Sequence, residues 1–133
     1  MASLKASTRG LKEIYDIRLF GLTAPREEIY KKIDDRVERM FASGAVAEVR
    51  RLMKRKLSRP AKAALGLKEI GGYIEGDYDL DTAKALLKMN TRRFAKRQLT
   101  WFRGDRRIRW FDMGSMSEAK ILKAICGSVW KER

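Results

Sequence analysis

Basic side chains recur along one stretch of the sequence at the spacing of helix neighbours. Between Thr91 and Gly104 the chain carries Lys and Arg but no Asp or Glu. Residues three or four apart lie on one face of a helix, where like charges repel each other. A solvated helix normally interleaves Glu with its cations, so this pattern favours a surface that a polyanion covers. The residues of this basic stripe are Arg93, Lys96, Arg97, Thr100 and Arg103.

Polar and aromatic residues in the same stretch could add base recognition to charge. Gln98 and Thr100 can hydrogen-bond base edges or phosphate oxygens. Trp101 or Phe102 can stack on an unpaired base, a contact worth roughly 1–3 kcal/mol. Large aromatic side chains are also highly buried on average, so we expect at least one of these two to be a core anchor. The spacing indicates nucleic acid and leaves RNA and DNA as alternatives.

The composition narrows the possible chemistry. The 133 residues include 31 Lys and Arg against 17 Asp and Glu, a net charge of +14 that favours polyanionic partners, with charge for solubility alone as the alternative. There is no His and Cys126 is the only Cys, which excludes histidine bases and His- or thiolate-based metal sites. No Gly-Lys dipeptide occurs, so a P-loop of the GxxxxGK[ST] type is absent. We therefore expect no catalytic and no metal-binding residue in this chain.

The apolar segments are short. None approaches the length of a membrane-spanning helix, and Met1 to Gly10 has no apolar signal core. Together with the single cysteine, these features predict a cytoplasmic protein without a membrane partner.

Hydrophobic periodicity and capping signals divide the chain into elements that would position the stripe. Residues 1–13 are polar and aperiodic and are expected to form a flexible lead-in to a folded part over 14–133. Asp79 or Asp81 can cap the longest helix, and Ser115 with Glu118 forms a capping box for the last one. The pattern predicts helices near 25–43, 45–54, 61–65, 67–74, 79–103 and 115–130 and short strands at 15–21 and 107–111.

Two features of this layout are unusual. The Gly71-Gly72 pair weakens its helix by roughly 1 kcal/mol per glycine. The two strands are far apart in sequence, and two lone strands rarely form a stable sheet in water. The fold class is therefore α+β and predominantly α-helical, with strands that need a sheet supplied by something else; the alternative is that they pair into a small ribbon.

Three motifs occur in order along the chain. AKRQLTWFR at Ala95 to Arg103 follows TRRF and precedes the I-x-W-F-D pattern of Ile108 to Asp112. FGLTAPREEIYKKIDDRVERMFASGAVAEVRRL runs from Phe20 to Leu52, and ALGLKEIGGYIEGD runs from Ala64 to Asp77. Over roughly Tyr15 to Asp112 the chain resembles the C-terminal portion of bacterial tRNA dimethylallyltransferases, also called tRNA isopentenyltransferases or IPP transferases.

The resemblance implies an activity for the complete enzyme. Such enzymes transfer a dimethylallyl group from dimethylallyl diphosphate to N6 of the adenosine adjacent to the anticodon, after extruding that base. In the family the P-loop, the general base and the base pocket lie in an N-terminal region. The chain then corresponds, over 14–133, to a C-terminal tRNA-binding fragment of a P-loop α/β enzyme, whose two strands would join the sheet of the missing N-terminal core.

The same resemblance implies the partners. They are the tRNA anticodon stem-loop and the missing P-loop region. This chain is expected to hold no cofactor and to be inactive alone, whereas the complete enzyme would use Mg²⁺ and dimethylallyl diphosphate.

The resemblance also suggests which residues bind tRNA. One surface matches Lys96 to Arg103 and another matches Ala63 to Lys68. The family often has a basic residue where this chain has Ala63, so Lys62 and Lys68 are the better candidates there; Leu67 stands where the family often has an aromatic. The expected tRNA-binding residues are Lys62, Lys68, Arg93, Lys96, Arg97, Gln98, Thr100, Trp101 and Arg103.

Two other classes of function stay open from the residues alone. A free-standing DNA-binding module could use the helices on either side of Gly44 as a helix-turn-helix. Against it, the second helix carries Glu48 and lacks Asn or Gln for reading base edges. A structural domain that docks on an acidic protein is the third possibility.

Overall fold

The structure is a computed structural model that describes residues 15–130, which divide between two compact units. The first unit holds residues up to Pro25 and from Phe102 onward, and the second holds Arg26 to Trp101. The predicted lead-in over 1–13 lies outside the described residues. Within residues 15–130, no helix is both long and apolar enough to cross a membrane.

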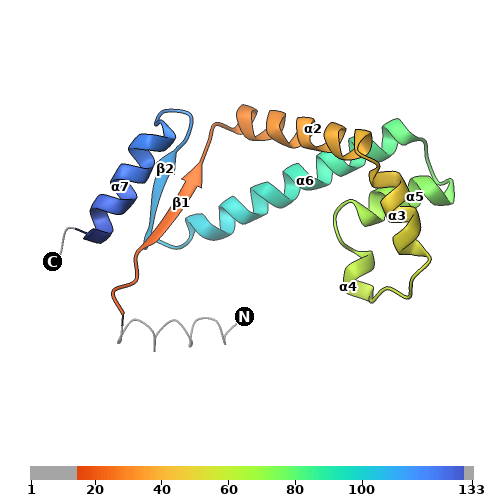
Figure 1. The fold of residues 1–133 in the computed structure, drawn as a ribbon, viewed down its shortest axis with the longest axis horizontal. Helices are drawn as coiled ribbons and strands as arrows, with labels where there is room; N and C mark the ends of the chain where they lie inside the picture. Colours follow the sequence, from red (N-terminus) through yellow and green to blue (C-terminus); the bar gives the residue numbers. More distant parts are fainter. Residues whose placement is uncertain (1–14, 131–133) are drawn as a thin grey trace. The chain divides into compact units, whose positions relative to one another are not determined.

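The described residues form six helices and two strands, so the prediction of a predominantly helical α+β fold is confirmed (Figure 1). The first unit contains β1 (Leu19–Thr23), β2 (Ile108–Asp112) and α7 (Glu118–Trp130). The second contains α2 (Arg26–Ala42), α3 (Ala45–Met53), α4 (Arg59–Lys62), α5 (Leu67–Glu75) and most of α6 (Leu80–Arg103).

The two strands pair with each other in parallel, with Leu19 opposite Ile108 and Thr23 opposite Asp112. Parallel neighbours need a long crossover, and here the whole second unit is the connection. The predicted start of β1 at Tyr15 was wrong, because the paired register begins only at Leu19 and residues 15–18 have no place in it. In the described part of the chain each strand keeps one unpaired edge.

The core of the first unit is small. Phe111 is buried, and its ring centroid lies 6.1 Å from that of Phe20 on the neighbouring strand. A β carbon at Gly21 would lie 2.6 Å from the ring of Trp110, so only glycine fits that position without a shift. Ile121 of α7 is the other buried residue of this unit.

The cap of α7 differs from the predicted one. The backbone N–H of Lys120 donates to Oγ of Ser117 at 3.4 Å, whereas the Ser115 hydroxyl donates to the carbonyl of Asp112. The predicted capping box of Ser115 and Glu118 was therefore wrong. In the turn after β2, the Ser115 hydroxyl is used for the hydrogen bond to the Asp112 carbonyl, so it does not cap α7.

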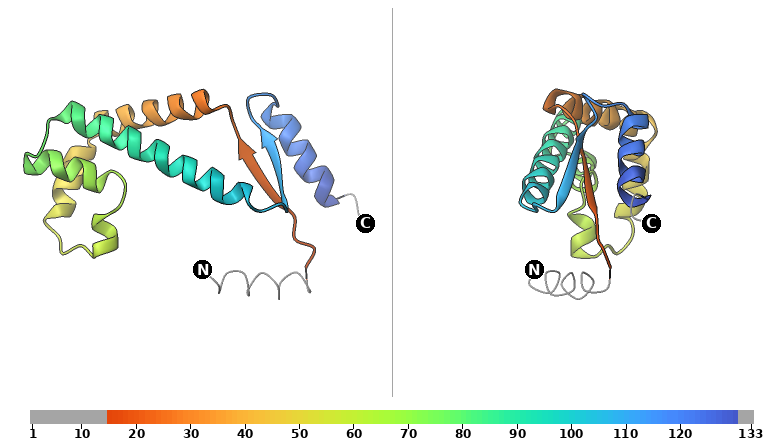
Figure 2. Two further views of the ribbon diagram at one scale, coloured as in Figure 1. Left: turned by 180° about the vertical axis from the view of Figure 1, so that it is seen from behind. Right: turned by 90° about the vertical axis from the view of Figure 1, so that its left-hand side faces the viewer.

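In the second unit, α2 and α6 run side by side in opposite directions (Figure 2). Glu38 of α2 accepts from Lys84 at 2.8 Å and from Lys88 at 2.7 Å. Asp34, one turn earlier, pairs with Arg92 further along α6. These contacts fix the pairing of the two helices, in which the buried residues are Val37 of α2 and Ala83 and Leu87 of α6.

Helices α3 to α5 form the rest of this unit. Gly44, with φ +94°, ends α2 as predicted and starts α3. Helix α3 packs on α5, and each of the two helices has a buried apolar residue, Val49 and Ile70. Helix α4 begins at Arg59 instead of Ala61, because Oγ of Ser58 accepts from the N–H of Ala61 and caps it.

Helix α5 contains the Gly71-Gly72 pair without interruption. A β carbon at Gly72 would lie 2.3 Å from the phenol oxygen of Tyr78, so the missing side chain makes room for that ring. The Tyr78 hydroxyl donates to the backbone carbonyl of Glu69 at 2.8 Å. The weakness that glycine brings to this helix is thus offset by a tertiary contact.

Candidate nucleic-acid interface

The second half of α6 presents the basic stripe to solvent. Oδ1 of Asp79 accepts from the N–H of Thr82 at 2.8 Å and sets the start of the helix. The buried Ala83 and Leu87 then define its inner face. Four stripe residues that follow within the second unit are exposed; they are Arg93, Lys96, Arg97 and Thr100. Among residues 15–130, none of the three cations in this set forms an ion pair.

The remaining residues predicted on this helix are also exposed. Gln98 and Trp101 belong to the second unit, whereas Arg103, in the last turn, belongs to the first. The exposed surface that lies within the second unit runs from Arg93 to Trp101, and we call it the outer face of α6. The Thr100 hydroxyl donates to the carbonyl of Lys96 at 2.9 Å, so its proton is used within the helix and its oxygen is left as an acceptor.

The expectation that Trp101 or Phe102 is a core anchor was wrong. Their exposed fractions are 66% and 42%. A third aromatic, Phe94, is also 42% exposed, although it matches the apolar period of the helix. The guanidinium of Arg97 lies 5.9 Å from the centre of the Phe94 ring. Phe94 and Trp101 are two turns apart and so lie on one side of the helix, next to the cations.

No binding role was predicted for Phe94 from the sequence. The available signal was its spacing, three residues before Arg97 and seven before Trp101, which places an aromatic pair beside a charged stripe. Arg92, by contrast, is not free for a ligand. Its side chain pairs with Asp34 and lies 5.0 Å from the ring centre of Tyr30, so it holds α6 against α2.

Two lysines of α6 have the same structural role. Hydrogen bonds from Lys84 and then from Lys88 lower the pKa of Glu38 to about 2, which keeps this carboxylate ionised across the physiological range. The same contact raises the pKa of Lys84. These cations are therefore committed to the contact between α2 and α6, whereas the cations of the outer face are not.

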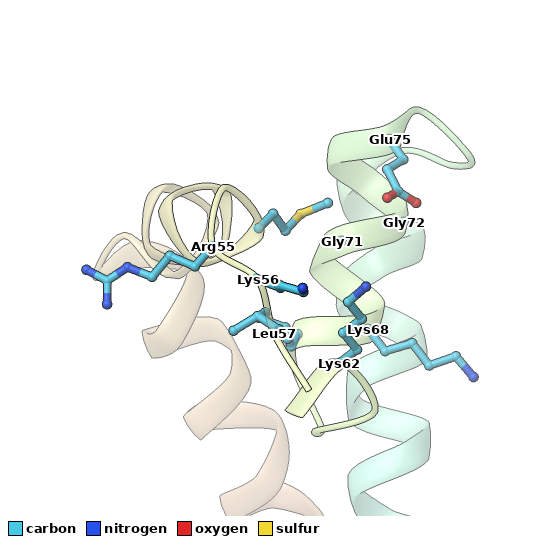
Figure 3. Close-up of a pocket in the computed structure, with 10 residues that line it drawn as sticks. Arg55, Lys56, Leu57, Lys62, Lys68, Gly71, Gly72 and Glu75 are labelled. Atoms are coloured by element: carbon cyan, nitrogen blue, oxygen red, sulfur yellow. The ribbon is translucent and has the colours of Figure 1, made fainter. Parts of the chain in front are cut away.

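Lys62 and Lys68 meet at a second location in the same unit, a pocket of about 350 Å³ (Figure 3). No binding role was predicted from the sequence for residues 55–60, so the place of Arg55, Lys56 and Leu57 in the lining of this pocket was missed. The signal was a run from Arg50 to Lys68 without any acid. The pocket is lined by Met53, Arg55, Lys56, Leu57, Lys62, Leu67, Lys68, Gly71, Gly72 and Glu75.

The turn that leads into α5 is held by a buried carboxylate. One oxygen of Glu69 accepts from the N–H of Gly66 at 2.9 Å, and the other accepts from the amide of Asn90 at 2.7 Å. Gly66 has φ +93°, a conformation that favours glycine. Burial, followed by the negative charge of Glu69, raises the pKa of Tyr78, so its hydroxyl stays a donor to the backbone of this helix.

Comparison with known proteins identifies close relatives. The family model described as IPP transferase matches residues 1–105. The tRNA dimethylallyltransferase of Natranaerobius thermophilus is 44% identical over 120 residues, which cover 89% of this chain and 36% of that protein. The enzyme of the same name from Carboxydothermus hydrogenoformans is 49% identical over 115 residues, covering 86% of this chain and 37% of the relative.

Two solved structures are similar over most of the chain. The full-length tRNA isopentenylpyrophosphate transferase of Bacillus halodurans matches with a TM-score of 0.80 and 36% identity, covering 86% of this chain and 38% of that one. The tRNA delta(2)-isopentenylpyrophosphate transferase of Staphylococcus epidermidis matches with a TM-score of 0.81 and 33% identity, covering 90% and 39%. The chain thus spans little more than a third of the length of the relatives it matches.

Proposed function

Because this chain belongs to the IPP transferase family, we propose that it is the tRNA-binding C-terminal part of a tRNA dimethylallyltransferase. The complete enzyme would transfer a dimethylallyl group from dimethylallyl diphosphate to N6 of the adenosine adjacent to the anticodon. In that enzyme, this chain would bind the anticodon stem-loop of the tRNA substrate. The enzyme would act in the cytoplasm.

The outer face of α6 is the observation that carries the proposal. It combines exposed cations, which attract phosphates, with exposed aromatic rings, on which unpaired bases stack. Gln98 adds an exposed amide that can hydrogen-bond the edge of a base. A surface that only served solubility would need neither the aromatic rings nor the exclusion of acids.

No step of the transfer reaction is assigned to residues of this chain. The sequence has no P-loop, and residues 15–130 contain no group of three or more His, Cys, Asp or Glu side chains that could hold a metal ion. We propose that Mg²⁺ and dimethylallyl diphosphate bind to the P-loop region of the complete enzyme.

The first unit would attach this chain to that region. The edges of β1 and β2 that are unpaired in the described part of the chain could each extend a larger sheet. Exposed apolar side chains at Leu22, Leu122 and Trp130 add surface that a partner would cover. We propose that these strands join the sheet of the nucleotide-binding core.

The test compares Gln98→Ala on an anticodon stem-loop RNA and on a blunt DNA duplex of equal charge at equal salt. If Gln98 contacts an opened loop, the loss should fall on the stem-loop alone, because a polar contact left unmade costs roughly 1–3 kcal/mol and the duplex never makes it. Equal losses of affinity for the stem-loop and the duplex would mean that the outer face binds nucleic acid by charge alone. Binding of the duplex in preference to RNA would favour the helix-turn-helix alternative.

Charge is tested separately with Lys96→Ala. Losing one phosphate contact should weaken all RNA sequences alike and lower the slope of log K against log salt by about one unit. Lys120→Ala, the same exchange at an exposed site of α7, is the control and should change neither quantity. An unchanged slope for Lys96→Ala would exclude the stripe as a phosphate contact.

A further inference from the structure

A second group of unpaired cations lies on α3 and directly after it. Arg50, Arg51, Lys54 and Arg55 are all exposed, and within residues 15–130 none of them forms an ion pair. We call these four residues the α3 cluster. Helix α3 packs on α5 and buries Val49, which leaves the cluster on its solvent side. Figure 3 shows the side chain of Arg55 pointing away from α5.

The charge of the α3 cluster is not balanced by nearby acids. No Asp or Glu occurs from position 49 to position 68. Arg50 and Lys54 are four residues apart, a spacing at which like charges destabilise a helix by roughly 0.2–0.5 kcal/mol per pair. Cations do complement the dipole at the end of a helix, but that effect is confined to its last turn. A cluster of this extent therefore fits a polyanionic partner.

The residues around the cluster indicate which part of a polyanion it contacts. Residues 45–62 contain no Phe, Tyr or Trp on which a base could stack, and no Asn or Gln that could read a base edge. The outer face of α6, by contrast, has Gln98 and exposed aromatic rings. Guanidinium groups bind pairs of phosphate oxygens and need no access to the bases. The cluster therefore fits the backbone of a paired RNA segment.

The α3 cluster and the outer face lie at different places in the second unit. Figures 1 and 2 show α3 near the beginning of α6, whereas the outer face belongs to the second half of that helix. Between Leu80, where α6 begins, and Arg93 the helix rises roughly 20 Å. An RNA that contacts both surfaces must therefore extend well beyond the nucleotides on the outer face.

We infer that the α3 cluster binds the phosphate backbone of the paired stem of the RNA whose loop lies on the outer face of α6. The inference rests on the proposed function and divides RNA recognition between two surfaces. The outer face contacts unpaired nucleotides, and the α3 cluster holds the stem by charge without reading its sequence.

The variant that tests the inference is Arg50→Ala/Arg51→Ala. Both side chains are exposed and alanine favours a helix, so the fold should be kept. Arg55→Ala removes a cation of the cluster that lies outside α3, and so leaves that helix unchanged. The matched control is Arg36→Ala, at an exposed arginine of α2 that has acids on both sides in the sequence.

The measurement is fluorescence anisotropy of the full chain with two hairpin RNAs that share one loop and have stems of about three and about ten base pairs. For the long hairpin, Arg50→Ala/Arg51→Ala should lower the slope of log K against log salt by about two units and raise the Kd about tenfold or more. For the short hairpin, both quantities should stay near the parent values. Lys96→Ala should weaken both hairpins, and Arg36→Ala should behave like the parent chain.

A second readout locates the contact on the RNA. In hydroxyl-radical footprinting, the parent chain should protect riboses of the long stem. Arg50→Ala/Arg51→Ala should remove that protection and leave the protection of the loop. If circular dichroism shows that the double variant does not fold, Arg55→Ala decides the matter, with a loss of about one unit of salt slope on the long hairpin alone.

The outcomes separate the two proposals. If Arg50→Ala/Arg51→Ala folds and keeps the parent Kd for the long hairpin while Lys96→Ala weakens it, the stem inference is wrong and the proposed function stands. If the double variant weakens the long and the short hairpin equally, the cluster does not contact the stem and the inference is overturned. If the parent chain binds neither hairpin, both proposals are overturned.

Discussion

The side-chain amide of Asn90 donates a 2.7 Å hydrogen bond to the carboxylate of Glu69, which is only 3% exposed. Asn90 lies on α6 one turn before the basic stripe, and Glu69 lies on α5 beside the pocket lysine Lys68. The second oxygen of Glu69 holds the turn at Gly66. One buried hydrogen-bond network thus links α6, which carries the outer face, to α5, which lines the pocket.

Asn90→Ala should destabilise the fold. It leaves one oxygen of a buried carboxylate without its donor, which costs about 1–3 kcal/mol. Urea unfolding followed by circular dichroism measures the loss. Gln98→Ala removes a comparable amide from an exposed position of the same helix and should leave the unfolding midpoint unchanged. Equal midpoints for the two variants would mean that the contact with Glu69 contributes nothing to stability.

The ion pairs of Glu38 should make stability depend on pH in the acid range. The pKa of Glu38 is about 2 in the folded chain against an ordinary value of 4.5. Because the folded pKa is the lower one, the stabilisation is fully present above pH 4.5 and is lost as the pH falls toward 2. The difference in urea midpoint between the parent and Glu38→Gln should therefore shrink across this window.

Glu75→Gln is the control for that experiment, since Glu75 is exposed and forms no ion pair within residues 15–130. Salt at about 1 M should also reduce the effect of Glu38→Gln, because exposed charges are screened. A difference between parent and Glu38→Gln that stays constant from pH 5 to pH 2 would contradict the role given to the two lysines.

The two neighbouring glycines of α5 should respond differently to alanine. At Gly72 the new methyl group would meet the ring of Tyr78 at 2.3 to 2.9 Å, so the ring must move and its hydrogen bond to Glu69 is lost. At Gly71 the contact is ordinary, and the gain in helix propensity is up to about 1 kcal/mol.

In a thermal melt, Gly71→Ala should therefore have a higher Tm than Gly72→Ala. In a Tyr78→Ala background the obstacle is gone, so the penalty of Gly72→Ala should disappear, as a double-mutant cycle would measure. A penalty that persists in that background would point to a cause other than the tyrosine.

Phe94→Ala should affect RNA binding more than stability. Because the ring is 42% exposed, the free energy of unfolding should change little, whereas the loss of a stacked base should weaken binding to the stem-loop by roughly 1–3 kcal/mol. Met89→Ala, at another half-exposed apolar position of α6, is the control and should not alter RNA binding. Equal RNA affinities for the two variants would remove Phe94 from the interface.

The isolated chain should transfer no prenyl group. Phosphate binding requires convergent backbone N–H groups and a cation, and the sequence contains no P-loop to supply them. Incubation with dimethylallyl diphosphate, Mg²⁺ and an anticodon stem-loop should leave the adenosine unmodified by mass spectrometry. Turnover above background would contradict the proposal that the P-loop region of the complete enzyme, and not this chain, binds dimethylallyl diphosphate.

Local signals in the sequence predicted most of the helices. Gly44 ends α2 and Asp79 caps α6, because a glycine stop and an N-cap act on their own helix and need no distant partner. The density of cations on α6 is likewise a property of the sequence, and the order of its motifs was sufficient to indicate the family. These signals did not determine which helix faces are buried by other elements.

Tertiary contacts decided the rest. The start of β1 depends on a partner strand some ninety residues away. The cap of α7 depends on the turn after β2, in which the Ser115 hydroxyl donates to the carbonyl of Asp112. Phe94 falls at the apolar period of α6, but only packing determines how far a side chain is covered, and in the structure Phe94 is 42% exposed. The pocket arises because α3, α4 and α5 fold against one another, which brings Lys56 and Lys68 to one cavity. The sequence by itself therefore determined the helices and their charge, whereas contacts between residues distant in the chain decided burial and the assembly of the sites.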